Sequence, residues 1–269
     1  MKYLYLSLFV FSVIFISCSG KTENTEKEET EAIVEEIEII KENDLEKNDL
    51  VGDIISINEI IYYADKTATD SLGEQYNRTY TKYNDKGYNT ITEFYTSLDD
   101  MIRRSINIME DDIVTKVEMY DGGDQLLNTD VYTYDENELL SEVASVSPDG
   151  TIYYTTYYTT DAKGRVSEMS SVSSSDNQEQ VHSTYKYNEQ GKRSESVFED
   201  ISGRYNRKYY YSYDVDGNLV STSVYDDSDR LIQELAYVYS FDENGNWIKR
   251  IESNQGRLTY ITVREIEYR

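Results

Sequence analysis

The sequence predicts an all-β protein built from tandem antiparallel β-hairpins, and three observations support this prediction. A short aromatic phrase recurs at intervals of 26 to 28 residues through the second half of the chain. Turn-forming residues recur about every 12–14 residues, between segments rich in Tyr, Val, Ile, Thr and Ser, which favour strands. Of the 28 Tyr, only Tyr3 and Tyr5 precede residue 50, which confines the hairpins to residues 51–269.

The first 17 residues are predicted to be a signal peptide, because Lys2 is followed by an apolar run too short to span a bilayer as a helix. The run ends in Phe15-Ile16-Ser17-Cys18, which resembles the lipobox of bacterial lipoproteins, although Phe15 stands where Leu is usual. This resemblance implies that Cys18 is lipidated and anchors the protein in the bacterial cell envelope, at the outer membrane or the cell surface. Ordinary secretion with an incidental Cys is the alternative.

Residues 18–50 are predicted to be an acidic spacer that follows the lipidated Cys. Lys21 to Leu50 contain no aromatic residue, 12 acidic side chains and 4 Lys, a composition that repels itself and extends. Ile33, Ile37 and Ile40 fall at helical spacing, so a short helix can form in the middle. The spacer either holds the folded part away from the membrane or is a solvated tail without a role.

Residues 51–269 are predicted to contain about seven repeats of about 26 residues each. The repeated phrase is an aromatic residue, any residue, a second aromatic residue, Asp or Asn, two further residues and Gly. It is clearest in 211–219 and 239–247. Other copies lie at 185–191, 158–164, 132–135 and 83–87, with a degenerate copy near 109–112.

A second turn lies about half a period after each phrase, so each repeat is predicted to be two antiparallel strands. Asp and Asn stabilise turns through side-chain hydrogen bonds, and Gly adopts positive φ without steric cost. The second turns are predicted at 121–123, 148–150, 201–203, 226–229 and 253–256. About fourteen strands would then form one long meander sheet, which must twist or curl and so cover part of its aromatic face.

The aromatic pairs indicate which face of each strand is apolar. In 132/134, 185/187, 211/213 and 239/241 the two rings are two residues apart, with a polar residue between them. Side chains alternate across a strand, so the rings share one face and the polar residues lie on the other. We therefore expect the rings of successive repeats to stack in columns.

The phrase in Tyr211–Leu219, repeated in Tyr239–Trp247, resembles the tyrosine-aspartate (YD) repeats of Rhs proteins and insecticidal toxin shells, and more loosely MORN-type hairpin repeats. This resemblance implies the strand-and-turn geometry of those repeats. In the large relatives, such repeats coil into a shell around a toxin. This chain is far too short to enclose a protein, so encapsulation and toxicity are not implied.

Composition excludes several functions. With 52 acidic residues against 26 Lys and Arg, the formal charge is −26, which argues against nucleic-acid binding. A single Cys and a single His argue against Cys/His zinc sites. His182 is the only residue that could serve a Ser-His-Asp triad, and no Gly-x-Ser-x-Gly motif accompanies it. We expect a protein that is not an enzyme and has no cofactor.

Calcium is the one metal for which the sequence offers candidate ligands. Asp214, Asp216 and Asp242 lie in Asp- and Asn-rich turns that resemble fragments of calcium loops. The bidentate acid that usually completes such a loop is missing at the required offset. Hydrogen-bonded hairpin turns explain the same residues without a metal, and these Asp residues stay weak candidates.

The predicted function is a binding or structural module of the cell envelope, contacting an envelope protein or a glycan through a Tyr-rich surface. Exposed rings in rows suit such partners. The candidate surface residues are Tyr153, Tyr157, Tyr185, Tyr209, Tyr211, Tyr239 and Trp247. Core packing is the competing explanation for each of them. The alternative functions are a carbohydrate-binding or calcium-dependent envelope protein, and an immunity-like partner of a toxin.

Overall fold

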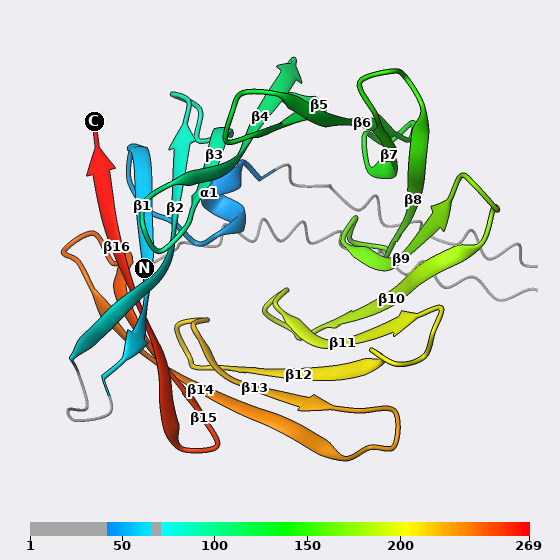
Figure 1. Ribbon diagram of the computed structural model, residues 1–269. Coiled ribbons are helices and arrows are strands. Elements are labelled where there is room, and N and C mark those ends of the chain that lie inside the picture. Colours follow the sequence, from blue (N-terminus) through cyan, green and yellow to red (C-terminus); the bar gives the residue numbers. More distant parts are fainter. Residues whose placement is uncertain (1–41, 66–70) are drawn as a thin grey trace, which may run out of the picture. The chain divides into compact units, whose positions relative to one another are not determined.

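Sixteen strands follow one another in the computed structural model, which describes residues 42–65 and 71–269, and consecutive strands pair antiparallel (Figure 1). One short helix, α1 (Asp44–Lys47), precedes them. The strands are β1 (Ile54–Ala64), β2 (Leu72–Tyr83), β3 (Asn89–Tyr95), β4 (Met101–Glu110), β5 (Ile113–Asp121), β6 (Leu126–Tyr134), β7 (Leu140–Val146), β8 (Ile152–Thr160), β9 (Val166–Ser173), β10 (Glu179–Tyr187), β11 (Arg193–Asp200), β12 (Arg207–Tyr213), β13 (Leu219–Tyr225), β14 (Leu231–Phe241), β15 (Trp247–Asn254) and β16 (Arg257–Tyr268).

The meander closes into a barrel because its first and last strands pair with each other. β1 and β16 form an antiparallel ladder that runs from Ile54↔Tyr268 to Tyr63↔Tyr260. The antiparallel hairpin meander is therefore confirmed, but the sheet is closed rather than open, and the described residues form sixteen strands rather than about fourteen. Closure gives hydrogen-bond partners to both edge strands, which an open sheet would leave unpaired.

The hairpin turns lie where the sequence predicts them. Asp214 shows the shared geometry, because its Oδ1 accepts the backbone N–H groups of Asp216 and Asn218 at 3.0 and 2.8 Å. Gly217 has a φ of +86° and its N–H donates to the carbonyl of Asp214, as in a type I turn followed by a bulge. Asp135, Asp161 and Asp242 make the same pair of side-chain bonds. The degenerate copy near 109–112 is also a turn, between β4 and β5.

Tyrosine hydroxyls link successive hairpins. The Tyr213 hydroxyl donates to the carbonyl of Arg193, at 2.7 Å, on the preceding strand β11. Tyr134 and Tyr187 make the corresponding bonds to β5 and β9, at 2.7 and 2.6 Å. In the last copy Phe241 occupies this position, and the first aromatic residue, Tyr239, bonds β13 at 2.9 Å instead.

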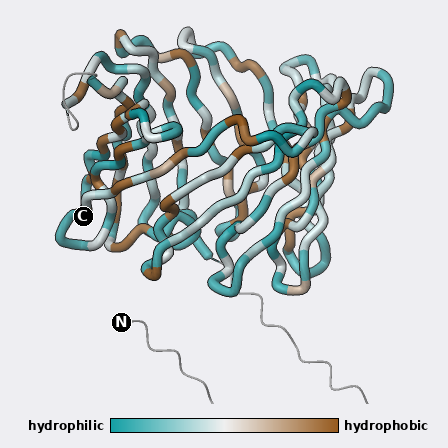
Figure 2. Tube along the Cα trace, turned by 90° about the horizontal axis from the view of Figure 1, so that it is seen from below, coloured by the Kyte–Doolittle hydropathy of each residue, from teal (hydrophilic) through white to brown (hydrophobic). Residues whose placement is uncertain are grey.

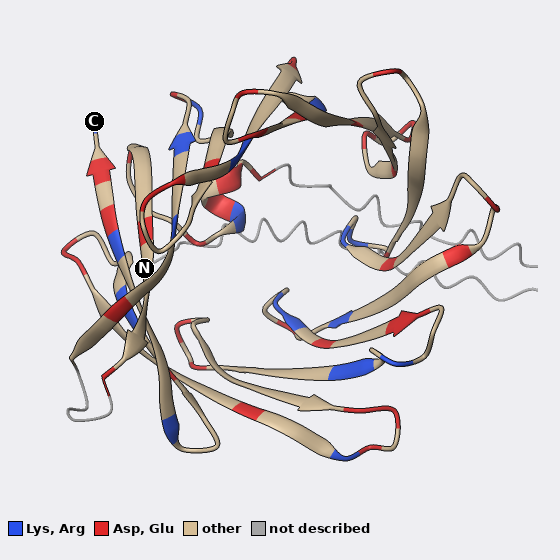
Figure 3. Cartoon of the chain, viewed as in Figure 1, with Lys and Arg blue, Asp and Glu red and all other residues tan. Residues whose placement is uncertain are grey.

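The last part of the predicted spacer packs against the barrel. Asn43 and Glu46 form a capping box around α1. Leu45 and Leu50 are buried with Ile54, Ile57 and Tyr83, which form the main apolar core. Figure 3 shows α1 within the ring of strands, although its acidic composition favours a solvated helix.

The segment 42–51 is bonded to opposite sides of the ring. The N–H of Leu45 donates to the carbonyl of Gly87, in the β2–β3 turn, at 3.1 Å. Asp49 pairs with Lys192, in the β10–β11 turn. In the strand order these two turns lie half-way round the barrel from each other. The segment thus crosses one end of the barrel, which we call the α1 end; the opposite end is the far end.

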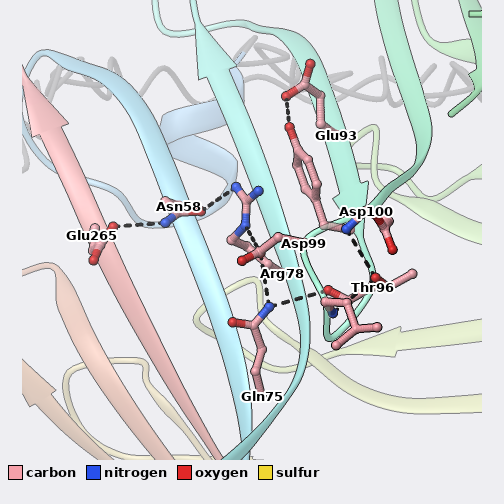
Figure 4. Close-up of polar contacts among 10 residues, drawn as sticks. Asn58, Gln75, Arg78, Glu93, Thr96, Asp99, Asp100 and Glu265 are labelled. Atoms are coloured by element: carbon pink, nitrogen blue, oxygen red, sulfur yellow. Dashed lines mark hydrogen bonds and ion pairs between the residues drawn. The ribbon is translucent and has the colours of Figure 1, made fainter. Parts of the chain in front are cut away.

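A polar network on the outer surface joins the strands where the barrel closes (Figure 4). Arg78 of β2 bonds Asp99 at 2.9 Å and Asn58 of β1 at 3.3 Å. Asn58 in turn donates to Glu265 of β16 at 2.9 Å. The Tyr95 ring covers the guanidinium of Arg78 at 3.6 Å, and the bond from Arg78 lowers the pKa of Asp99. Each charged group here has a partner, so the network stabilises the closure.

Candidate functional site

The inward face of the barrel is the face that contacts α1. Ile57 of β1 packs against Leu45, and side chains alternate along the strand, so Glu59, Ile61 and Tyr63 also point inward. The pairing registers carry this assignment round the barrel. In Figure 2 the turns at both ends are mostly hydrophilic, and hydrophobic residues lie along the strands with polar ones between them.

The structure divides the predicted surface residues between the two faces. Tyr153 and Tyr157 lie on the outer face of β8 and are 48% and 50% exposed. The remaining five lie on the inner wall and are partly buried: Tyr185, Tyr209, Tyr211, Tyr239 and Trp247. Five of the seven candidate residues therefore share the inner wall, and Tyr153 and Tyr157 do not.

The inward rings do not stack in columns as the sequence predicts. Ser196 of β11 pairs with Tyr185 on one side and with Tyr209 on the other. Tyr211 likewise faces Thr222, which is 5% exposed. From β10 to β13 the rings therefore occur on every second strand, about 9–10 Å apart, with small side chains between them.

Two cavities lie against the inner wall. The first, of about 340 Å³, lies next to the segment 42–51 and is lined by Tyr213, Tyr239, Trp247 and two arginines, Arg250 and Arg264, among other residues. The second, of about 240 Å³, lies toward the far end and is lined by Ile61, Tyr76, Arg250, Glu252, Tyr260 and Thr262. Arg250 lines both.

Arg264 is held in place by two neighbours. Its Nε donates to Glu59 at 2.8 Å, and its guanidinium lies 3.3 Å from the centre of the Trp247 ring. Burial lowers the pKa of Arg264, while Glu59 opposes that shift. Trp247 packs edge-on against Tyr239, with ring centres 5.8 Å apart. Trp247 is thus neither a free platform nor a fully buried core residue, because it also lines the first cavity.

At the far end, three tyrosines form a cluster. The ring centres of Tyr63, Tyr76 and Tyr260 are 5.2 to 5.6 Å apart. Tyr63 and Tyr76 are 45% and 44% exposed, so these rings are available to a ligand that enters from the far end. The repeated phrase does not reveal this cluster, because its three tyrosines belong to β1, β2 and β16, outside the aromatic phrases.

The turn aspartates are engaged as caps. Asp214 and Asp242 accept the N–H groups of their own turns, and Asp216 is exposed beside Asp214. The pKa of Asp214 is lowered, mainly by the hydrogen bond from the Asn218 side chain and further by the backbone N–H groups of the turn. Within residues 42–65 and 71–269, no group of three His, Cys, Asp or Glu side chains is arranged to hold a metal ion.

His182 lies on the outer face of β10. Its Nε2 is 2.9 Å from a carboxylate oxygen of Glu168, and its Nδ1 is 3.8 Å from Glu199. This position is remote from the inner wall, so His182 takes no part in the candidate site.

The predicted signal peptide and Cys18 lie outside the described residues. In the part of the chain that the structure describes, no helix has the length and apolar character needed to cross a membrane.

Comparisons with known proteins support the fold. No protein-family model and no curated protein matches the sequence. A porin-like protein from Bacteroides uniformis matches with a TM-score of 0.51 at 11% identity, over 80% of this chain and 96% of that chain. A porin-like protein from Bacteroides vulgatus gives 0.45 at 11% identity, over 78% and 97%. A LolA superfamily protein from Nitrosomonas europaea gives 0.30 at 13% identity, over 84% and 91%. The chain therefore has an all-β, barrel-type repeat fold, and membership of the YD/Rhs family is not shown.

Proposed function

We propose that this protein is a lipid-anchored, non-enzymatic binding protein of the bacterial cell envelope, and that the interior of its barrel binds a glycan. The lipobox-like Phe15-Ile16-Ser17-Cys18 supports the anchor. The similar fold of a porin-like protein is in keeping with an envelope location. We also interpret the hairpin unit as a YD-type repeat, on the strength of the aromatic phrase and its Asp-capped turn.

The observation that carries the proposal is the chemistry of the inner wall. On β10 to β13, half-buried Tyr rings alternate with Ser and Thr side chains. Elsewhere on the same wall, Tyr, Trp and Arg side chains line two cavities. Aromatic faces pack against the apolar faces of sugar rings, while hydroxyl groups bond the sugar hydroxyls. The segment 42–51 crosses the α1 end, so we infer that the glycan enters from the far end.

The charged side chains on the outer wall favour a barrel that is surrounded by water rather than by lipid. His182 pairs with Glu199, and Lys186 pairs with Glu195, on the outer faces of β10 and β11. A barrel embedded in lipid presents an apolar band at these depths, where charged side chains are strongly destabilising. We therefore assign membrane attachment to the lipid on Cys18 rather than to the barrel.

A glycan array tests the binding function. We expect the full chain to bind envelope glycans equally with and without EDTA. Tyr211→Leu, which removes a ring from the inner wall and keeps an apolar side chain, should weaken binding at least tenfold. The matched control, Tyr157→Leu on the outer face, should leave binding unchanged. Loss of binding only in Tyr157→Leu, or binding to no glycan, would contradict the proposal, and loss in EDTA would indicate a calcium-dependent protein.

Palmitate labelling in the bacterial host tests the anchor. Wild type should incorporate label and Cys18→Ala should not. Equal labelling of the two proteins would show that Cys18 is not the lipidated residue.

A further inference from the structure

Arg250 is the cation of the first cavity whose charge is not balanced. Four basic side chains line this cavity: Lys47, Lys192, Arg250 and Arg264. Lys47 lies 3.6 Å from Asp44, Lys192 pairs with Asp49, and Arg264 pairs with Glu59 at 2.8 Å. Among the described residues, Arg250 has no carboxylate within ion-pair distance. A part-buried charge in this position favours an anionic partner.

Part of the hydrogen-bonding capacity of Arg250 is also unused, beyond its contacts with the Thr262 hydroxyl and the Tyr239 phenol. A guanidinium has five N–H donors. Nη2 makes one long bond, 3.4 Å, to the Thr262 hydroxyl, and Nε is buried without a partner in the described structure. The guanidinium lies 5.3 Å from the Trp247 ring centre and 5.6 Å from that of Tyr237. Two rings thus position a cation that lines both cavities.

A second polar side chain without a partner lies on the same row of the wall. The pairing registers place Arg250, Thr262, Ile61 and Asn77 side by side on β15, β16, β1 and β2. The Asn77 Oδ1 is buried and, among the described residues, accepts no hydrogen bond. Three strand spacings separate Arg250 from Asn77, about 14 Å, which is the scale of two to three linked sugar rings.

We propose that the glycan is an acidic one, and that Arg250 binds a carboxylate of a sugar acid in the first cavity, beside Tyr239 and Trp247. This inference rests on the proposed function and narrows its ligand class. A guanidinium suits a carboxylate because it can donate two parallel N–H bonds.

The charge of Glu252 determines which of the two cavities the carboxylate of the ligand faces. Glu252 lies two residues from Arg250 on the inner wall, lines the second cavity, and accepts the Thr259 hydroxyl at 2.9 Å. Its charge disfavours an anion on that side. The carboxylate of the ligand therefore lies toward the first cavity and its basic side chains, and the neutral rings extend toward the tyrosine cluster at the far end.

Titration calorimetry of the full chain tests this inference, with oligogalacturonate as the acidic probe and its methyl ester as the neutral one. Wild type should bind the acid at least tenfold more tightly than the ester. Arg250→Gln should bind both alike, Arg250→Lys should keep part of the preference, and the outer-face control Lys186→Gln should match wild type.

Equal wild-type affinity for acid and ester would overturn the inference, and so would an acid preference that survives in Arg250→Gln. Circular dichroism checks that the variants fold. If a variant does not fold, the wild-type affinities for the acid and the ester still test whether the ligand is acidic. Binding of the ester alone would refute the acidic ligand and leave a glycan-binding barrel in place, which separates this failure from that of the proposed function.

Discussion

Single residues determine where each hairpin turns. Asp and Asn at the first position of the turn accept two backbone N–H groups, and the residue three positions later has positive φ. Gly occupies that position in most copies, and Glu138 occupies it in one, with a φ of +59°. The sequence predicts these turns because their chemistry is local: the side chain and the N–H groups that it binds lie within four residues.

Gly245 allows the cost of positive φ to be measured separately from steric clashes of an added side chain. Its φ is +86°, and an added Cβ would meet nothing within 4 Å. Gly245→Ala should therefore lower the free energy of unfolding by about 1 kcal/mol through backbone strain alone. Urea denaturation measures the change, with the exposed Glu243→Ala in the same turn as the control. Equal midpoints for wild type and Gly245→Ala would show that this turn tolerates side chains.

The inward phenols should make the protein sensitive to alkali. Burial raises the pKa of Tyr132 to about 12, and burial raises the pKa of Tyr158, Tyr213 and Tyr239 as well. In the unfolded chain, tyrosine ionises near pH 10. Stability that depends on protonated phenols is therefore complete below pH 10 and is lost as the pH rises through the folded-state values.

Urea midpoints at pH 8, 10, 11 and 12 test this dependence. The midpoint should fall between pH 10 and 12, and the fall should be shallower in Tyr132→Phe, which cannot ionise at that position. A midpoint that stays constant to pH 12, or the same fall in wild type and Tyr132→Phe, would contradict the role of the buried phenol.

At the level of elements, the sequence predicts the hairpins well and the helix poorly. Strand alternation and turn residues repeat, so each hairpin supports the interpretation of the next. The segment 42–51 has the composition of a spacer, and only Leu45 and Leu50 distinguish it from one. Its partners, Gly87, Lys192 and Asn246, are distant in sequence, so its place across the α1 end depends on the closed barrel.

Leu45 measures how strongly this segment is held. It is 7% exposed and packs in the main apolar core. Leu45→Ala should lower the free energy of unfolding by about 2–3 kcal/mol, since it leaves a cavity among residues that can relax only partly. Leu98→Ala, at a position that is 81% exposed, should change it by less than about 0.5 kcal/mol. Similar small effects of both substitutions would show that α1 is not packed on the barrel.

In the candidate site, too, residues marked by the local repeat could be predicted, whereas a residue whose position depends on strand pairing could not. Tyr185, Tyr211 and Tyr239 were identified because the aromatic phrase marks them. Arg250 was missed, because counting by twos from Trp247 places Lys249 with the ring. Phe241 pairs with Trp247 but Ser240 pairs with Lys249, so Ile248 is the extra residue of a bulge in β15, and this bulge brings Arg250 to the inner wall.

At the scale of the whole molecule, closure of the barrel brings residues of the first and last strands together on the inner wall. Two terminal strands pair residues about 200 positions apart, such as Ile60 with Val263. Nothing in the repeat specifies this pairing, because each unit contacts mainly its neighbours. Curling the sheet brings β1 to β16, and only then do Arg250, Thr262, Ile61 and Asn77 form one row.

A cysteine cross-link between β1 and β16 tests whether the barrel is closed. Ile60→Cys and Val263→Cys, in the full chain with Cys18→Ser, place two thiols on paired residues of β1 and β16. The closed barrel predicts an intrachain disulfide at high dilution, seen as a gel shift that reductant reverses, and none when Ile60→Cys is combined with Val238→Cys on β14. An extended open sheet would hold β1 and β16 about 70 Å apart. Free thiols, or cross-links only between molecules, would contradict the closed barrel and the interior site derived from it.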